Sequence, residues 1–355
     1  MDFSEVCSRV QGLIWNNGLA SIAGASLIMG INALLVKLVV ARVPVFEIVV
    51  GRAVLSWTLS VTVGKIQGQA RLYGQRKNYI PMLVRSTTGS ASMALYYYGL
   101  LYLPLADTVT LLFMNPVLVC LLAWVLLGEH MGLLGIAGVV GSFLGVVLVS
   151  QPPVLFGGSD SVPWTPQHMT GVLASIGAAF MVACAFVSIR FMSGESALSI
   201  ALWFHTCSIF VGIVPTVVGW PSPAVVPSAQ DALIMVFVGV TSFVGQVLLG
   251  RGYQLEVASK VAAVNYLQVV FASFFGIVFL GERLTLLAIL GSILIAMGVV
   301  LANMGKAKKP ASDSAQPSSV KAEGYHELEM QEEGGIQREA SGHLLPKPSQ
   351  LGSGQ

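Results

Sequence analysis

Ten long apolar runs restrict this chain to one kind of environment. They lie near residues 18–40, 44–63, 79–101, 105–127, 131–150, 170–190, 197–218, 231–250, 258–280 and 284–303. A helix needs about 20 apolar residues to cross the hydrocarbon core of a bilayer, and its backbone is hydrogen-bonded within the segment. Only 10% of the residues are charged, against about 25% in soluble domains. We therefore predict an all-α membrane protein with ten transmembrane helices.

Lys and Arg in the short loops indicate the orientation of these spans. With the N-terminus in the cytosol, the outer loops hold Arg42 and Arg283, and the other loop cations fall inside. Cytosolic loops are enriched in Lys and Arg, so we expect a multi-pass protein with both termini cytosolic. The pattern leaves the plasma membrane and the endomembranes as alternatives.

The chain nearly repeats itself at an offset of 153 positions. LGEHMGLL at 127–134 returns as LGERLTLL at 280–287. The same offset, without a gap, aligns Gly18 with Gly171, Gly99 with Gly252, Gly138 with Gly291, and GVVL at 145–148 with GVVL at 298–301. Such self-similarity predicts two copies of one structural unit, each with five spans.

An odd number of spans per copy makes the two halves enter the membrane from opposite sides. Inverted repeats of this kind are typical of secondary transporters, which bind substrate near the midplane between the halves. We expect a cytosolic segment at 1–17, a first repeat at 18–150, an extracytosolic linker at 151–169, a second repeat at 170–304 and a disordered cytosolic tail at 305–355.

Several motifs resemble one family of transporters. They are LxxADTVTxxFxNPxxxxxxAWxxLGE at 103–129 with its copy at 255–282, PVFEIVVGRAV at 44–54 and QPPVLFGG at 151–158. The pattern resembles the EamA-type drug/metabolite transporter superfamily, and the last two motifs resemble the G branch of the nucleotide-sugar-transporter-like solute carriers. The resemblance implies ten helices, cytosolic termini and a central cavity lined mainly by spans one, three, four, six, eight and nine.

Ionisable and polar residues within the spans are the candidates for substrate binding, because a charge in the membrane is costly unless it is paired or hydrated. Arg52 aligns with His205, Asn115 with Gln268, and Asp107 with Lys260. The predicted substrate-binding residues are Arg52, Lys260, Asn115, Gln268, Tyr266, Tyr97 and His205. The in-span charges sum to a positive value, which favours a small anionic substrate.

Four further charged residues are predicted to form gates or ion pairs. Lys37 and Glu47 flank one tight outer loop and are expected to lie at one depth, where they could pair. Arg85, near the inner end of span three, either acts there or extends its guanidinium to the interface. Asp107 lies near the outer face and could close a gate on that side.

The LGE motifs and the glycine stripes have structural explanations. Gly128 and Gly281 are expected to form the turns between spans, and Glu129 and Glu282 to occupy the first turn of the following helix, where an acid is favoured by the helix dipole. Glycines in spans five and ten, such as Gly138 and Gly291, predict close packing or a homodimer face.

Other classes of function receive little support from the sequence. A net charge of +2 argues against nucleic acid, and the P-loop motif of ATP-driven pumps is absent from the sequence. We expect no metal, no cofactor and no enzyme activity, since His205 is the only histidine within a span. The prediction is a secondary transporter of a small polar or anionic metabolite, with membrane lipid and substrate as partners.

The alternative function is a non-transporting membrane scaffold or regulator that acts through the tail. YHEL at Tyr325–Leu328 resembles a signal for a sorting adaptor, so an adaptor is a further expected partner.

Overall fold

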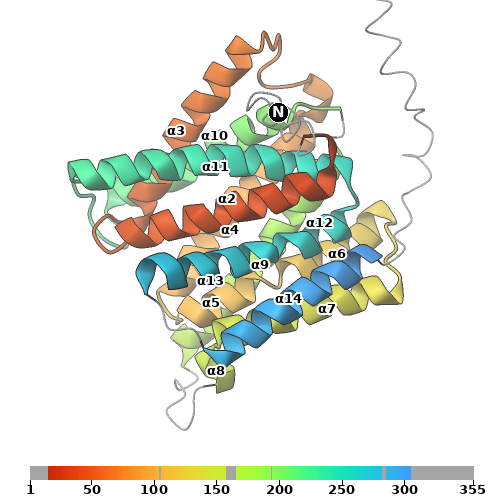
Figure 1. The fold of residues 1–355 in the computed structure, drawn as a ribbon. Coiled ribbons are helices and arrows are strands. Elements are labelled where there is room, and N and C mark those ends of the chain that lie inside the picture. The colour runs from red at the N-terminus through yellow and green to blue at the C-terminus, as the bar shows by residue number, and fades with distance from the viewer. Residues whose placement is uncertain (1–14, 104, 157–164, 193, 282–284, 305–355) are drawn as a thin grey trace, which may run out of the picture. The chain divides into compact units, whose positions relative to one another are not determined.

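The computed structural model describes residues 15–103, 105–156, 165–192, 194–281 and 285–304, and its elements are helices (Figure 1). The first half contains α2 (Gly18–Val39), α3 (Val45–Ile66), the short 3-10 helix η1 (Arg76–Asn78), α4 (Tyr79–Leu100), α5 (Leu105–Leu112), α6 (Asn115–Leu127) and α7 (Leu133–Ser150). After α8 (Pro153–Phe156), the second half contains α9 (Pro166–Arg190), α10 (Ala197–Val218), α11 (Ala229–Leu255), α12 (Ala258–Asn265), α13 (Leu267–Leu280) and α14 (Leu286–Met304).

The ten predicted spans are confirmed, with two of them broken. Within the described ranges, nine segments are long and apolar enough to cross a membrane, and α5 with α6 and α12 with α13 each count as one. The tenth span is α4, which has 22 residues like α2 but is less apolar. Its Arg85, Ser86, Ser90 and Ser92 are buried against other helices, so they lower its hydropathy without facing lipid.

Helix contacts follow the repeat. The contact of α2 with α11 is equivalent in the repeat to that of α4 with α9. The contact of α3 with α11 is likewise equivalent to that of α10 with α4. α3 also packs on α10, and α7 on α14, which are pairs of equivalent helices. Exchanging the two halves therefore leaves the set of neighbours unchanged, as expected for inverted repeats around a pseudo-two-fold axis.

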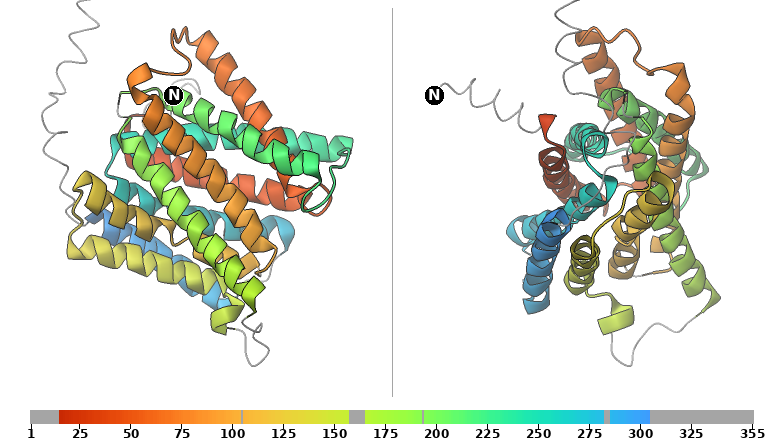
Figure 2. Two further views of the ribbon diagram at one scale, coloured as in Figure 1. Left: turned by 180° about the vertical axis from the view of Figure 1, so that it is seen from behind. Right: turned by 90° about the vertical axis from the view of Figure 1, so that its right-hand side faces the viewer.

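The glycine stripes of the fifth and tenth spans face each other within one chain. α7 and α14 lie side by side in the views of Figures 1 and 2. A Cβ on Gly145 would lie 2.6 Å from the carbonyl oxygen of Gly291, and a Cβ on Gly291 would lie 2.7 Å from that of Gly145. These stripes are thus used by packing inside the monomer, and a homodimer through other faces of the two helices stays a prediction.

Several predicted features fall outside the described residues. They are most of the cytosolic segment 1–17, residues 157–164 of the linker, Glu282, the tail 305–355 and the adaptor motif at Tyr325–Leu328.

Candidate functional site

Polar side chains from α3, α4, α10 and α11 meet inside the helix bundle. These four helices pack against one another through α3–α10, α3–α11, α4–α10 and α10–α11 contacts. The residues that we call the cation cluster are Arg52, Arg85, Met93, His205, Ser242 and Gln246. Sequence analysis predicted the three basic members as functional residues, and the structure adds the three neutral ones.

Arg52, on the second turn of α3, contacts neutral partners. One terminal nitrogen, Nη2, lies 2.7 Å from the Met93 sulfur on α4, and Nη1 lies 3.4 Å from the Ser242 hydroxyl on α11. A thioether is a weak acceptor and a guanidinium has five N–H donors. The contacts therefore leave most of the hydrogen-bonding capacity of Arg52 for another ligand.

Arg85 is buried, with 2% of its surface exposed, so it does not extend to the interface. Its Nη2 donates to the Gln246 side-chain oxygen at 2.8 Å, and its guanidinium carbon lies 4.6 Å from the centre of the Phe204 ring. The Nε–H has no hydrogen-bond partner among the described residues. Arg85, predicted as a gate or ion-pair residue, is instead a buried cation held by an amide and an aromatic face.

His205 and Tyr97 complete the surroundings of the two arginines. His205 is 1% exposed and interacts electrostatically with both Arg52 and Arg85, and its Nε2 has no hydrogen-bond partner within the described ranges. Tyr97 interacts electrostatically with Arg52, and its ring packs edge-on against Phe46 at 5.3 Å. The structure therefore brings together three predicted substrate-binding residues, Arg52, Tyr97 and His205.

Carboxylates in the described part of the chain are engaged away from this cluster. Glu47 accepts a hydrogen bond from the Val225 backbone N–H at 3.0 Å, and Asp231 pairs with Arg42 at 2.6 Å. Neither Arg52 nor Arg85 forms an ion pair with any described residue. A cation without a counterion is costly inside a membrane unless it is hydrated or bound, so these two arginines are the strongest candidates for a ligand contact.

The two broken spans are connected at their breaks. α5 ends at Leu112 and α6 begins at Asn115, whereas Tyr266 alone separates α12 from α13. The Tyr266 hydroxyl donates to the Phe113 carbonyl at 3.0 Å, and these two residues are equivalent in the repeat. Discontinuous helices at equivalent positions of both halves mark the midplane binding region of many transporters.

The break in the first half has a local cause. Pro116 lacks the N–H that would bond to the Leu112 carbonyl, and the Asn115 side-chain nitrogen donates to that carbonyl at 2.8 Å instead. In the part of the chain that the structure describes, the buried side-chain oxygen of Asn115 has no hydrogen-bond partner, and neither has that of Asn265 beside the second break. Asn115 and Tyr266, both predicted to bind substrate, thus lie where the helices open.

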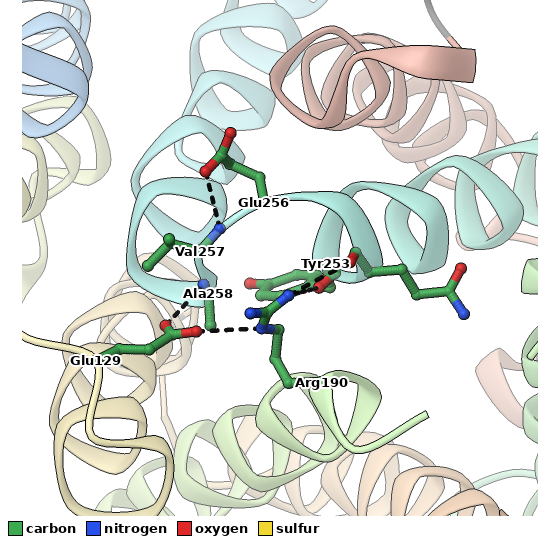
Figure 3. Close-up of polar contacts among 7 residues, drawn as sticks. Glu129, Arg190, Tyr253, Glu256, Val257 and Ala258 are labelled. Atoms are coloured by element: carbon green, nitrogen blue, oxygen red, sulfur yellow. Dashed lines mark hydrogen bonds and ion pairs between the residues drawn. The ribbon is translucent and has the colours of Figure 1, made fainter. Parts of the chain in front are cut away.

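Glu129 lies elsewhere than expected. α7 begins at Leu133, so Glu129 is in the connection before that helix rather than in its first turn. Its carboxylate accepts from Arg190 Nε at 3.1 Å and from the Ala258 backbone N–H at 3.0 Å (Figure 3). It therefore stabilises the N-terminus of α12, in the other half of the chain. The preceding Gly128 ends α6 with φ +64°, and Gly281 ends α13 with φ +66°.

The contacts of Glu129 belong to a larger polar network at this end of the bundle. Arg190 also donates to the carbonyls of Tyr253 and Gln254, at 3.4 and 3.3 Å. The Gln254 side chain donates to the carbonyls of Met192 and Glu195, at 3.1 and 2.8 Å. We call this group the end network. It consists of Glu129, Arg190 and Gln254, together with the backbone carbonyls and the backbone N–H group that they bind. It joins the first half to three helices of the second.

The remaining predicted residues lie apart from the cation cluster. Lys260 is half-buried on α12 and Gln268 is half-buried on α13. Lys37 is exposed near the end of α2, and Asp107 is buried in the first turn of α5. Two hollows, of about 360 Å³ between α6 and α7 and about 620 Å³ before α4, contain no predicted substrate-binding residue.

The sequence did not lead us to predict three of these residues as functional, although the repeat contains a signal for each of them: Gln246, Met93 and Arg190. Met93 and Gln246 are 153 positions apart, and so are Lys37 and Arg190. Thus the partners of Arg52 and Arg85 occupy equivalent positions of the two halves. The offset also places a basic residue at the same point of both halves.

Comparison with known proteins identifies the class. The profile of the EamA-like transporter family matches twice, over residues 16–151 and 169–304. The chain belongs to this family, as the sequence resemblance predicted, and with its long apolar helices it is an integral, multi-pass membrane protein.

Individual relatives are more distant. The chain is 29% identical to human solute carrier family 35 member G1 over 66% of its own length and 64% of the relative. It is 28% identical to the Pseudomonas aeruginosa pseudopaline exporter CntI, over 78% of its length and 92% of the exporter. The match thus spans less than two thirds of the human protein. A solved crystal structure, covering 80% of this chain and 95% of its own, shares the fold with a TM-score of 0.69 at 16% identity.

Proposed function

We propose that this protein is a secondary transporter that carries a small anionic metabolite by alternating access. The observation that carries the proposal is the cation cluster, where Arg52 and Arg85 are enclosed among neutral partners. Two guanidinium groups near a buried histidine suit a substrate with one or two carboxylate or phosphate groups, because charge-assisted hydrogen bonds to such groups are short and strong.

The named relatives support solute movement rather than a particular substrate. Two relatives are named a solute carrier and an exporter of pseudopaline. Because the fold does not define the ligand, neither name supplies the substrate of this chain.

The end network suggests how one side closes. With both termini cytosolic, Glu129, Arg190 and the start of α12 lie at the cytosolic end, and their contacts tie the two halves together there. Opening to the cytosol must separate these groups, and closing must reform them. An anion that binds the form open to one side of the membrane more tightly than the form open to the other side would shift the population toward the first form. The size of the shift is limited by the difference between the two affinities.

A melting-temperature screen of the purified protein tests the proposal. The panel would hold di- and tricarboxylates, amino acids, nucleotide sugars, purines and sugar phosphates. A ligand at a hundredfold excess over its Kd stabilises the folded protein by about 2.7 kcal/mol. We expect a shift from one anionic class that disappears in Arg52→Gln and Arg85→Gln and persists in Arg42→Gln, and flux of that anion in proteoliposomes. A shift that survives both inner substitutions, or a neutral ligand alone, would contradict the anionic site.

Removal of residues 305–355 separates transport from the scaffold alternative. A transporter whose site lies in the helices keeps its flux when the tail is deleted. A scaffold that acts through the tail loses its partner and has no flux to lose.

A further inference from the structure

The segment between α3 and α4 surrounds a hollow of about 620 Å³, a volume in the usual range of ligand sites. Its lining includes Arg71 and Arg76 together with Tyr73 and Tyr79. It belongs to the connection between two spans, and its lining includes no member of the cation cluster. The lining therefore combines positive charge with aromatic rings at one membrane surface.

Hydrogen bonds fix this loop to the second half of the chain. The backbone N–H of Gln75 and the side chain of Asn78 donate to the Glu195 carboxylate, at 2.9 and 2.6 Å. The Trp203 ring nitrogen donates to the Tyr73 carbonyl at 3.1 Å, and Gln69 donates to the Ser199 hydroxyl at 2.8 Å. The hollow is thus held open by contacts with α10 rather than formed by a free loop.

Positive charge in the loop is not neutralised by the described residues. Lys65, Arg71, Arg76 and Lys77 are exposed and form no ion pair with any described carboxylate. The adjacent carboxylate, Glu195, receives its hydrogen bonds from neutral groups. Arg42, in the loop at the other end of α3, is by contrast paired with Asp231. The hollow therefore presents free guanidinium groups to an anion.

The aromatic and aliphatic side chains beside the hollow indicate its position relative to the lipid headgroups. The Trp203 ring packs against those of Tyr73 and Tyr79, with centroids 6.2 and 5.4 Å apart. Tyr and Trp gather at the level of lipid headgroups. Directly after Tyr79, the side chains of Ile80 and Leu83 are 76% and 49% exposed, as expected of residues that contact acyl chains. These surfaces suit a ligand whose phosphate group contacts the lining arginines and whose acyl chains contact the exposed apolar side chains of α4.

We propose that this hollow binds the phosphorylated headgroup of an anionic phospholipid, with Arg71 and Arg76 as the phosphate ligands and the acyl chains along the start of α4. Basic pockets beside transmembrane helices bind such headgroups, and arginine binds phosphate in bidentate geometry. On the expected topology this lipid lies in the cytosolic leaflet. The proposal is independent of which solute the protein carries.

The test uses the full-length protein in detergent and follows its melting temperature. The probes are dioctanoyl phosphatidylinositol bisphosphate, dioctanoyl phosphatidylcholine, soluble inositol trisphosphate and inorganic phosphate. We expect stabilisation by the bisphosphate lipid, and none by phosphatidylcholine or inorganic phosphate at equal concentration. A lipid that shifts the melting temperature no more than inositol trisphosphate does would overturn the lipid assignment in favour of a soluble anion.

Two double variants separate the hollow from general surface charge. Arg71→Gln/Arg76→Gln removes the lining cations and should weaken lipid binding by at least about tenfold, since two charge-assisted contacts are lost. Lys65→Gln/Lys77→Gln removes the same charge from the end of α3 and from η1, outside the lining, and should weaken binding by no more than about threefold. Equal losses in the two variants, or no binding in the natural protein, would refute a defined headgroup site. Arg71→Lys/Arg76→Lys, which keeps the charge, should fall between them.

Discussion

Two groups of charged side chains inside this protein are built in opposite ways. In the end network, the Glu129 and Arg190 side chains are 0% and 7% exposed, form an ion pair and make further hydrogen bonds to backbone groups. In the cation cluster, Arg52 and Arg85 contact a thioether, a hydroxyl, an amide and a ring, without a carboxylate. The first arrangement stabilises a contact between the halves, whereas the second leaves positive charge for a ligand.

The largest effect on stability is expected from breaking the end network. Glu129→Gln or Arg190→Gln leaves one buried charge without its partner, which typically costs about 3 kcal/mol or more of unfolding free energy. The double variant should lose less than the sum of the two, because the charges are coupled. Thermal unfolding in detergent measures all three.

Arg42→Gln is the matched control for that experiment. It breaks the other described ion pair, in which the Arg42 side chain is 53% exposed. An ion pair open to solvent contributes less than a buried one, so the loss should be smaller than that from Arg190→Gln. Equal losses from Arg42→Gln and Arg190→Gln would show that the end network does not stabilise the fold in the way its burial indicates.

The cation cluster should respond in the opposite direction. Arg52→Met replaces a cation that has no counterion among the described residues by an apolar chain, so the unfolding free energy should stay unchanged or rise by up to about 2 kcal/mol. Transport of the anionic substrate should fall by at least about tenfold, because a charge-assisted contact is lost. A destabilised Arg52→Met protein with normal flux would assign Arg52 to the structure instead.

The sequence predicts the transmembrane spans and the inverted pairing of the two repeats better than it predicts which groups contact the charged side chains inside the bundle. Apolar length is a local property, and the odd number of spans per repeat follows from counting, so the inverted arrangement was accessible. The partners of Arg52 and Arg85 depend on tertiary packing, since Met93 and Gln246 are 41 and 161 positions away. Glu129 likewise stabilises a helix that begins 129 positions later. The break at Asn115 has a proline to mark it, whereas the break at Tyr266 has no such residue.

A built-in counterion would sharpen the comparison further. Gln246→Glu places a carboxylate at the atom that now lies 2.8 Å from Arg85 Nη2. The cluster would then resemble the end network, so we expect unfolding free energy to rise by about 1 kcal/mol and anion binding to weaken by about tenfold. Gln246→Met, which copies the repeat-equivalent Met93, adds no charge and should keep binding within about threefold. Equal binding by the Glu and Met variants would separate Arg85 from the substrate.

The smallest expected effect concerns the contact between the two helix breaks. Tyr266→Phe removes the hydrogen bond from the Tyr266 hydroxyl to the Phe113 carbonyl and keeps the ring, whose centroid lies 6.3 Å from that of Phe113. A single neutral hydrogen bond contributes about 1 kcal/mol to the free energy of unfolding. Because no charge is exposed or neutralised, we expect a loss of that size in thermal unfolding, with substrate affinity retained. A loss of affinity without a loss of stability would instead make the Tyr266 hydroxyl a substrate contact, and would extend the binding site from the cation cluster to the broken helices.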